Sequence, residues 1–318
     1  MRFDFSGVPI FWRVTDALSR DIEPNDELWH SLFDTPAYRA LTASEFSADF
    51  FKQCWRLAFR PGLRSENPPP GQLRFIQHYR QVVQAKEELE GFLEEMARSP
   101  DLYRSAVDMA MRHLPPGDYG DDPRVAFAVF DLDGRGYCPI VIDPLLAMTS
   151  GEALMPFLAH EFHHHYMCQL TGLQLGTSTD DRTALEWVVD QVHLEGLADM
   201  VNVDAEFEQG TVSESLADEV EKTPQFLRFM DTQLRSLGKH PDEASSIGEK
   251  IKGRLAASGH PVGYYMARMI RDQLGKTRLL DTCRDPLLFF RAYCEAEEHA
   301  GLASNLSAEG LKVLERSR

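Results

Sequence analysis

His160, Glu161 and His164 have the residue types and the spacing that metal-assisted hydrolysis requires. On an α-helix, positions i and i+4 lie on one face about one turn apart, so the imidazoles of His160 and His164 would lie side by side. Two such nitrogens could share one tetrahedral ion. Glu161 follows the first histidine and could direct its carboxylate at a water on that ion, as a general base. The pattern therefore predicts a zinc site that activates water.

The surrounding sequence favours a helix at this motif. An apolar run, residues 153–159, precedes it, and the motif has mechanical meaning only on a helix. Two simpler explanations stay open. A pattern with three fixed positions arises by chance in unrelated chains, and histidines 163–165 could form a surface tract that binds metal weakly.

A second expected helix, residues 184–201, offers the third ligand that a catalytic zinc needs. Glu195 and Asp199 are four residues apart and therefore share a helix face. We expect Glu195 to bind the metal, and Asp199 to accept a hydrogen bond from the free ring N–H of a ligand imidazole, first of all His160. The alternative is that both are ordinary solvated acids.

Gly196 directly follows Glu195 in the middle of this expected helix. A glycine there costs about 1 kcal/mol relative to alanine, so we expect a packing reason, such as the close approach of another element. Glu186 is the other candidate ligand on the helix. It is nine residues from Glu195, nearly on the opposite side, so the two cannot bind one ion together.

The combined pattern, His160-Glu161-x-x-His164 followed by Glu195-x-x-x-Asp199, resembles the gluzincin metallopeptidases, the clan that includes thermolysin. The gap between the two motifs is 195 − 164 = 31 positions, which that clan tolerates. The resemblance implies that the two histidines and Glu195 hold Zn²⁺, that Glu161 activates water, and that Asp199 orients a histidine. It does not imply a substrate, because substrate choice depends on loops that differ between members.

A later stretch, Gly-His-Pro-Val-Gly-Tyr-Tyr at residues 259–265, adds to the resemblance, which then covers residues 125–275. Together with the two motifs it is similar to bacterial families of zinc-dependent peptidases of unknown function. Gluzincins use a tyrosine or histidine to stabilise the oxyanion of the reaction, and the resemblance points to His260 and Tyr264 for this role. A packed tyrosine and a helix-capping histidine are the simpler explanation of these two residues.

Several neighbouring side chains have secondary roles in this interpretation. Tyr265 replaces Tyr264 if the helix is rotated, and Arg268 either contacts a substrate carboxylate or pairs with a neighbouring acid. Gly263 would permit close approach of another element. The remaining side chains near the motifs are expected off the ligand faces or, for the cysteine, as a buried thiol: His163, His165, His193 and Cys168.

Composition excludes some classes of function. The net charge of −17 argues against nucleic acid, whose phosphates need clustered Lys and Arg, and against an anionic membrane surface. No segment is long and apolar enough to be a signal peptide or to cross a bilayer. The five cysteines are scattered and odd in number, which favours a reducing cytoplasm over a disulfide framework.

The element pattern predicts an α+β fold that is predominantly α-helical and zincin-like. We expect a small β-sheet with an edge strand beside an active-site helix, and helical domains flanking a cleft. Residues 1–115 would form a helical N-terminal region, residues 116–210 the metal-binding catalytic core, and residues 211–318 a helical C-terminal region that closes the cleft.

The expected helices cover residues 26–39, 42–60, 72–98, 101–114, 213–221, 224–237, 241–257, 261–274, 286–298 and 307–316. Asn25 caps the first, and Thr42 with Glu45 forms a capping box for the second. Residues 61–71, rich in proline and glycine, are the best candidate for a linker.

Two strands, residues 124–130 and 137–143, are expected as a hairpin with an Asp-Gly turn at residues 133–134. A calcium loop is disfavoured because Ile142 stands where such a loop needs glutamate. Pro139 cannot donate a ladder hydrogen bond, so its strand is expected at the sheet edge, where it could hold a substrate backbone by strand addition or simply end the sheet.

These observations predict a zinc metallopeptidase acting on peptides or proteins, with His160, His164 and Glu195 as ligands. Two alternatives stay open. The same scaffold could hydrolyse another amide or an ester, or the chain could be a non-catalytic zinc-binding regulatory protein. The retained Glu161 speaks against the second alternative, because a purely structural site has no use for a general base.

Overall fold

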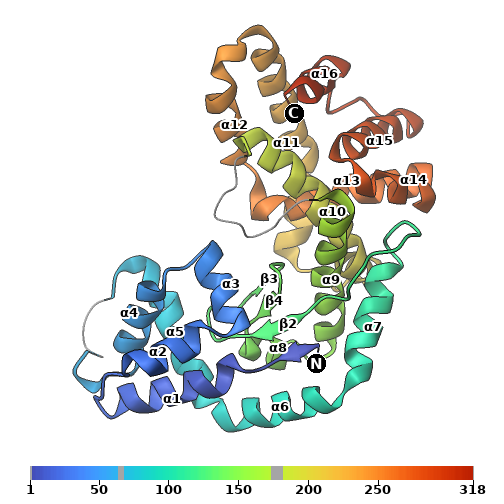
Figure 1. Cartoon of the computed structure of the whole chain (residues 1–318). Helices are drawn as coiled ribbons and strands as arrows, with labels where there is room; N and C mark the ends of the chain where they lie inside the picture. The colour runs from blue at the N-terminus through green and yellow to red at the C-terminus, as the bar shows by residue number, and fades with distance from the viewer. Residues whose placement is uncertain (1, 64–67, 173–181, 318) are drawn as a thin grey trace. The chain divides into compact units, whose positions relative to one another are not determined.

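The computed structural model describes residues 2–63, 68–172 and 182–317 (Figure 1). These residues are mostly helical and contain one small mixed sheet, which confirms an α+β fold that is predominantly α. They divide into two compact units. The first unit holds described residues up to 107 together with residues 120–165, and the second holds residues 108–119, 166–172 and 182–317.

The first unit contains the sheet and the helices that connect or follow its strands in the sequence. Its elements are β1 (Phe3–Asp4), α1 (Gly7–Ser19), α2 (Asp26–Phe33), α3 (Pro36–Ser44), α4 (Ala48–Phe59), α5 (Leu73–Gln84), α6 (Lys86–Arg98), β2 (Val125–Phe127), β3 (Gly134–Arg135), β4 (Ile140–Ile142) and α8 (Pro144–Thr149). Helices α7 (Pro100–Met111) and α9 (Leu154–Thr171) contribute residues to both units.

The described residues of the second unit form helices and the segments that connect them, without a strand. Its elements are α10 (Ala184–Gln209), α11 (Glu214–Lys239), α12 (Ala244–Lys252), α13 (His260–Leu274), α14 (Lys276–Asp281), α15 (Pro286–His299) and α16 (Ala308–Arg316). The expected helices 213–221 and 224–237 form the single helix α11, with Pro224 inside it. The packing of Phe226, Leu227 and Met230, all buried, offsets the hydrogen bond that the proline removes.

The strand order of the sheet is β1-β2-β4-β3. Strands β1, β2 and β4 run parallel, and β3 pairs antiparallel with β4, so that Gly134 lies opposite Ile142. The expected hairpin between residues 124–130 and 137–143 is therefore wrong, because β2 and β4 are parallel neighbours. The Asp-Gly step does not form the turn of that hairpin, because Gly134 is itself a strand residue.

The expected edge position of the Pro139 strand is also wrong. Strand β4 lies between β2 and β3, and β3 is the edge strand on that side of the sheet. Pro139 precedes β4, so the ladder does not require an N–H from it. Both central strands are buried along their whole length, as expected for parallel strands covered on both faces.

The helices near the N-terminus differ from the expected ones in their bounds. The sequence predicts one helix over 26–39, but α2 ends at Phe33 and α3 begins at Pro36. Thr42 lies inside α3 and donates its hydroxyl to the Tyr38 carbonyl, so it opens no helix. Ser47 caps α4 instead, accepting a hydrogen bond from the Phe50 N–H at 3.1 Å.

Further differences concern elements that the pattern hides. Strand β1 and helices α1 and α14 have no counterpart among the expected elements, and the expected helix 72–98 divides at Ala85 into α5 and α6. The expected linker, residues 61–71, begins and ends in short 3-10 turns, and its residues 64–67 lie outside the described residues.

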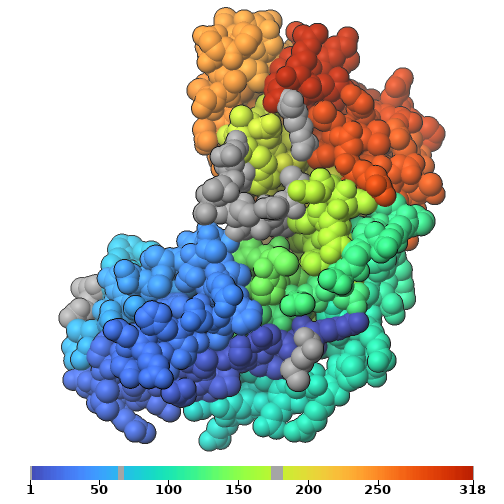
Figure 2. All heavy atoms as spheres, viewed as in Figure 1, coloured from blue at the N-terminus to red at the C-terminus, as the bar shows by residue number. Residues whose placement is uncertain are grey.

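An aromatic cluster holds the N-terminal helices together. The Trp55 ring is fully buried and stacks on Phe51 at 5.2 Å and on Trp29 at 6.0 Å between centroids. The Tyr38 hydroxyl donates to the Val129 carbonyl at 3.0 Å, which ties α3 to the segment after β2. In the space-filling view the blue atoms of these helices form one continuous part of the first unit's surface (Figure 2).

Helices α10 and α13 of the second unit touch backbone to backbone. A Cβ atom on Gly196 would lie 2.5 Å from the Gly263 carbonyl carbon, and one on Gly263 would lie 2.2 Å from the Val192 carbonyl oxygen. Real side chains do not tolerate such distances, so both glycines are required by the crossing. The packing reasons expected for Gly196 and Gly263 are thereby confirmed. Among the described residues, no helix has the length and hydropathy to span a membrane.

This contact predicts a large loss of stability for Gly263→Ala. The added methyl group must push α10 and α13 apart, and such overpacking costs about 3 kcal/mol. Gly91→Ala is the matched control, because Gly91 is exposed in α6 with open space around it. The control should gain about 0.5–1 kcal/mol from its helix propensity. Urea unfolding measures both, and a Gly263→Ala variant as stable as the parent would contradict the contact.

Candidate metal centre

Helix α9 carries the first motif, as the sequence predicts. His160, Glu161 and His164 lie on this helix and are all at least 93 % buried. The two histidine rings meet edge to face, and their Nε2 atoms are 3.0 Å apart. Two ring nitrogens at this distance need a shared proton or a shared cation, because their lone pairs otherwise repel each other.

The histidine pair fits a tetrahedral zinc ion. Zinc–nitrogen bonds of about 2.0–2.1 Å at a tetrahedral angle place two ligand nitrogens about 3.3 Å apart. The His160 and His164 Nε2 atoms, at 3.0 Å, are within a few tenths of an ångström of this spacing. Their burial also suits a metal site, because a dry environment strengthens the electrostatic interactions of a bound cation.

Glu161 lies against the edge strand of the sheet. A Cβ atom on Gly134 of β3 would lie 3.4 Å from Glu161 Oε1 and 2.5 Å from the ring of Phe157, one turn earlier on α9. With any other residue at position 134, the ring of Phe157 would have to shift. The sequence predicts a turn at Gly134, whereas the structure places this residue beside the Glu161 carboxylate, the expected base.

The other histidines near the motifs have their own surroundings. His163 is fully buried, and the His165 ring nitrogen Nε2 lies 3.1 Å from the Asp121 carbonyl, to which it donates. His193, on α10, is buried and donates from Nε2 to the Thr282 carbonyl at 3.0 Å. These contacts are with backbone carbonyls, which agrees with the expected secondary roles of His165 and His193.

The second unit gathers Glu195, Asp199 and His260. Glu195 and Asp199 occupy α10, and His260 is the first residue of α13, preceded by Gly259 with φ of 103°. His260 Nδ1 lies 3.1 Å from both Asp199 carboxylate oxygens, and its Nε2 lies 3.3 Å from Glu195 Oε2. The two acids therefore bracket one imidazole, and they are mostly buried rather than solvated, with side chains 13 % and 3 % exposed.

Asp199 thus orients a histidine, and that histidine is His260. A carboxylate accepts hydrogen bonds only, so the Nδ1–H of His260 is the donor and Nε2 faces Glu195. The pairing of Asp199 with His160, which the sequence favours, stays a prediction. The negative charge of Asp199, after burial, also raises the pKa of Glu206, two turns further along α10.

Tyr264 lies inside the contact between α10 and α13. Its ring is fully buried and stacks on Phe207 at 4.8 Å, and its hydroxyl donates to Asp204 at 3.1 Å. Arg271 pairs with the same carboxylate. Burial and the charge of Asp204 raise the pKa of the Tyr264 hydroxyl far above its usual value. The hydroxyl is therefore already engaged within the second unit.

The alternative candidates have structural explanations. Glu186 completes a capping box with Thr183 at the start of α10: its carboxylate accepts from the Thr183 N–H at 2.7 Å, and its N–H donates to the Thr183 hydroxyl at 3.2 Å. Arg268 pairs with Asp272 at 3.6 Å, which was one of its two expected roles. Tyr265 packs toward Tyr293, and Cys168 is partly buried.

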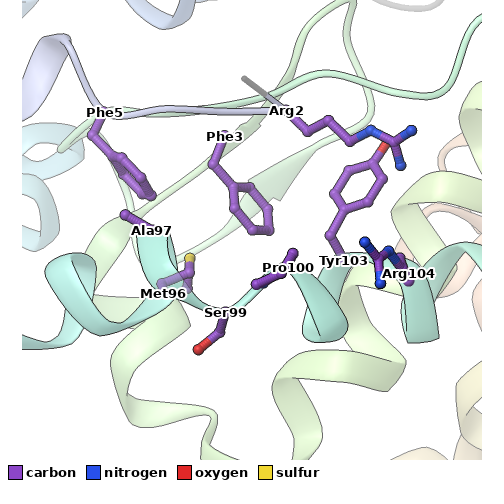
Figure 3. A pocket seen from close by; sticks show the side chains of 9 residues that line it. All are labelled: Arg2, Phe3, Phe5, Met96, Ala97, Ser99, Pro100, Tyr103 and Arg104. Carbon is purple, nitrogen blue, oxygen red and sulfur yellow. The ribbon is translucent and has the colours of Figure 1, made fainter.

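The hollow drawn in Figure 3 lies elsewhere in the first unit. It has a volume of about 330 Å³ and lies between β1 and the junction of α6 and α7, with Phe3 and Tyr103 among its walls. Its arginines have acidic neighbours, Asp122 at 2.5 Å for Arg2 and Asp101 at 3.4 Å for Arg104. None of the candidate catalytic or metal-binding residues contributes to it.

Comparison with known proteins agrees with this chemistry. No curated protein and no solved structure gives a significant match to the chain. A family model does match, over residues 29–301, and its description is "Putative zinc dependent peptidase (DUF5700)". The matched range is most of the chain and includes every candidate site residue from His160 to Tyr264. The chain therefore belongs to this family of zinc-dependent peptidases.

Proposed function

We propose that the protein is a zinc metallopeptidase of the gluzincin type, which hydrolyses peptide bonds with Glu161 as general base. One observation carries the proposal. The His160 and His164 Nε2 atoms lie 3.0 Å apart on a buried helix, and Glu161 follows the first of them in the sequence. Membership of the zinc peptidase family supports the same chemistry. The proposed substrate is a peptide or a protein.

The proposed ligands are His160, His164 and Glu195. The sequence supports Glu195 as the third ligand through its spacing from Asp199, and the partial burial of its carboxylate is consistent with this role. When bound, zinc would supply Lewis-acid chemistry, which lowers the pKa of water to about 7 and polarises a carbonyl. We propose a reducing, cytoplasmic environment, because the five cysteines are scattered along the sequence and odd in number.

Glu161 would move the proton of the reaction. Its carboxylate takes a proton from water as the water oxygen attacks the peptide carbonyl, and it then delivers that proton to the departing amine. The position of Gly134 beside Glu161 supports β3 as the strand that holds the substrate backbone. An extended peptide would add to this edge by main-chain hydrogen bonds, so the scissile bond would pass close to the carboxylate.

His260 is the better candidate for stabilising the oxyanion. Asp199 accepts a hydrogen bond from its Nδ1–H, which fixes the ring, and Nε2 can then donate to the oxyanion when it carries a second proton, as in an imidazolium. A donor held in this way costs little reorganisation when negative charge develops. Tyr264 is the weaker candidate, because its hydroxyl already donates to Asp204 in a fully buried position.

Metal analysis tests the ligand set. Purified protein should contain about one zinc per chain, and His160→Ala, His164→Ala and Glu195→Ala should each lose most of it, because three protein ligands hold a catalytic zinc. His165→Ala is the control and should keep its metal, since His165 contacts a backbone carbonyl. Plasma emission spectrometry gives the ratios. Full zinc in the Glu195→Ala variant would exclude Glu195 as a ligand.

Glu161→Gln tests the base. The amide cannot accept the proton, so kcat should fall by about 10³-fold or more, and zinc should stay bound. Glu152→Gln is the control, an exposed acid ahead of α9 that should keep full activity. Digestion of a peptide library, read by mass spectrometry, measures turnover. Zinc-loaded parent protein that cleaves esters or other amides but no peptide would favour the alternative hydrolase, and no cleavage at all would favour a regulatory protein.

His260→Gln and Tyr264→Phe distinguish the two oxyanion donors. Loss of the donor should lower kcat by about 10²–10³-fold with little change in KM, and we expect this only for His260→Gln. Tyr264→Phe removes the hydrogen bond to Asp204, so it should cost about 1 kcal/mol of stability and leave kcat within a few-fold of the parent. Steady-state kinetics and urea unfolding measure these effects. The reverse pattern would assign the role to Tyr264.

A further inference from the structure

The outer edge of β3 is the edge at which the proposed function places a substrate. The Asp143 N–H donates to the Asp133 carbonyl at 3.1 Å, and Gly134 lies opposite Ile142. Because hydrogen-bonded and non-hydrogen-bonded pairs alternate in antiparallel strands, the N–H and C=O of Gly134 point away from β4. These two groups are therefore what β3 offers to an added strand at this position.

Two side chains cover both groups. The Gly134 N–H donates to Asp133 Oδ1 at 2.8 Å, and Arg135 Nη1 donates to the Gly134 carbonyl at 2.9 Å. The same Nη1 meets Asp133 Oδ2 at 2.5 Å, so the two side chains bridge across the outer face of the glycine. An extended peptide that pairs with Gly134 must displace at least one of them.

Arg135 is held more firmly than Asp133. Its guanidinium makes a two-point contact with Glu45, at 2.7 and 3.1 Å, and lies 5.5 Å from the centre of the Phe130 ring. Burial alone would raise the pKa of Glu45, but the hydrogen bond and charge of Arg135 outweigh it and lower that pKa. The Arg135 side chain is 19 % exposed, whereas that of Asp133 is 56 % exposed. Asp133 is therefore the side chain that can move aside.

Asp133 is also the surplus acid at this edge. Arg74 pairs with Asp131 at 3.0 Å, and Arg135 has Glu45. Asp133 shares Arg135 with Glu45, so the local charges leave one carboxylate in excess. Its Oδ2 can stay near Arg135, but Oδ1 loses its donor once it leaves Gly134, and a Lys or Arg side chain of a bound peptide would give it a charge-assisted hydrogen bond.

We propose that Asp133 is a specificity-determining residue that selects peptides with a Lys or Arg side chain next to the backbone that pairs with Gly134. The substrate class would then be basic peptides. In the free protein Asp133 covers the Gly134 N–H, and in the complex it turns to the basic side chain while the peptide backbone takes its place. This inference rests on the proposed function, because it takes β3 as the strand that binds the substrate.

Peptide binding to the full-length, zinc-loaded Glu161→Gln variant tests the inference without hydrolysis. Fluorescence anisotropy would compare extended peptides that carry Lys, Gln or Glu at each position in turn. At one position the Lys peptide should bind about tenfold more tightly than its Gln counterpart, and added salt should weaken this preference. Asp133→Asn in the same background should reduce the preference to less than about twofold, since the amide keeps an acceptor for Gly134 but has no charge.

Two further variants sharpen the test. Asp133→Lys should reverse the preference toward Glu peptides, and Asp101→Asn, an exposed acid on α7, should leave it unchanged. Three results would overturn the inference. Asp133→Asn could keep the full Lys preference, it could bind all peptides more tightly by the same factor, or the Glu161→Gln protein could bind no peptide at all.

The same peptides incubated with the parent protein separate this inference from the proposed function. Cleavage without any dependence on Asp133 would retain the peptidase and reject the role of Asp133. A Lys preference in binding that depends on Asp133, together with no cleavage by the parent, would retain the role of Asp133 and reject the catalysis.

Discussion

Close approach to the main chain at glycine positions is the constraint that the two units share. In the second unit Gly196 and Gly263 let α10 and α13 touch, and in the first unit Gly134 lets β3 lie against Phe157. The functional side chains flank these contacts in the sequence: Glu195 precedes Gly196, and His260 begins the helix that contains Gly263. Glu195 and His260 are therefore attached close to a main-chain contact, which limits how far their Cα atoms can move.

The two units bury different kinds of ionisable side chains. The first buries two imidazoles whose ring nitrogens face each other, and the second buries two carboxylates around one imidazole. Ionisable groups are costly to remove from water unless hydrogen bonds or counter-charges compensate them. Two imidazole nitrogens that face each other, as in the first unit, are satisfied by a cation, which agrees with a zinc-dependent family. The capping box at Thr183 and the pair between Asp204 and Arg271 show that neighbouring polar groups serve the fold instead.

The sequence predicts what local periodicity controls. The helical positions of His160 and His164, the shared face of Glu195 and Asp199, and the packing role of Gly196 all follow from spacing along one helix. The bounds near the N-terminus do not, because Thr42 and Ser47 both fit a helix start, and in the structure Thr42 bonds within α3 while Ser47 caps α4. A two-residue strand such as β3 is too short to show an alternating pattern, and an Asp-Gly step is typical of turns. The sequence therefore predicts the Pro139 strand at the edge of the sheet, where the structure has β3. The contact of Asp199 with His260 joins residues 61 positions apart and has no local signal.

The adjacency of Glu195 and Gly196 has a mechanical consequence for α10. A helix held by a main-chain contact at one residue can still bend or tilt about that residue, and the displacement of its other residues grows with their distance from the contact. Glu195 lies one residue from the contact, a rise of about 1.5 Å along the axis. No residue other than a direct neighbour could lie as close to the contact at Gly196. Thermal bending of this 26-residue helix would therefore displace its ends far more than the carboxylate of Glu195.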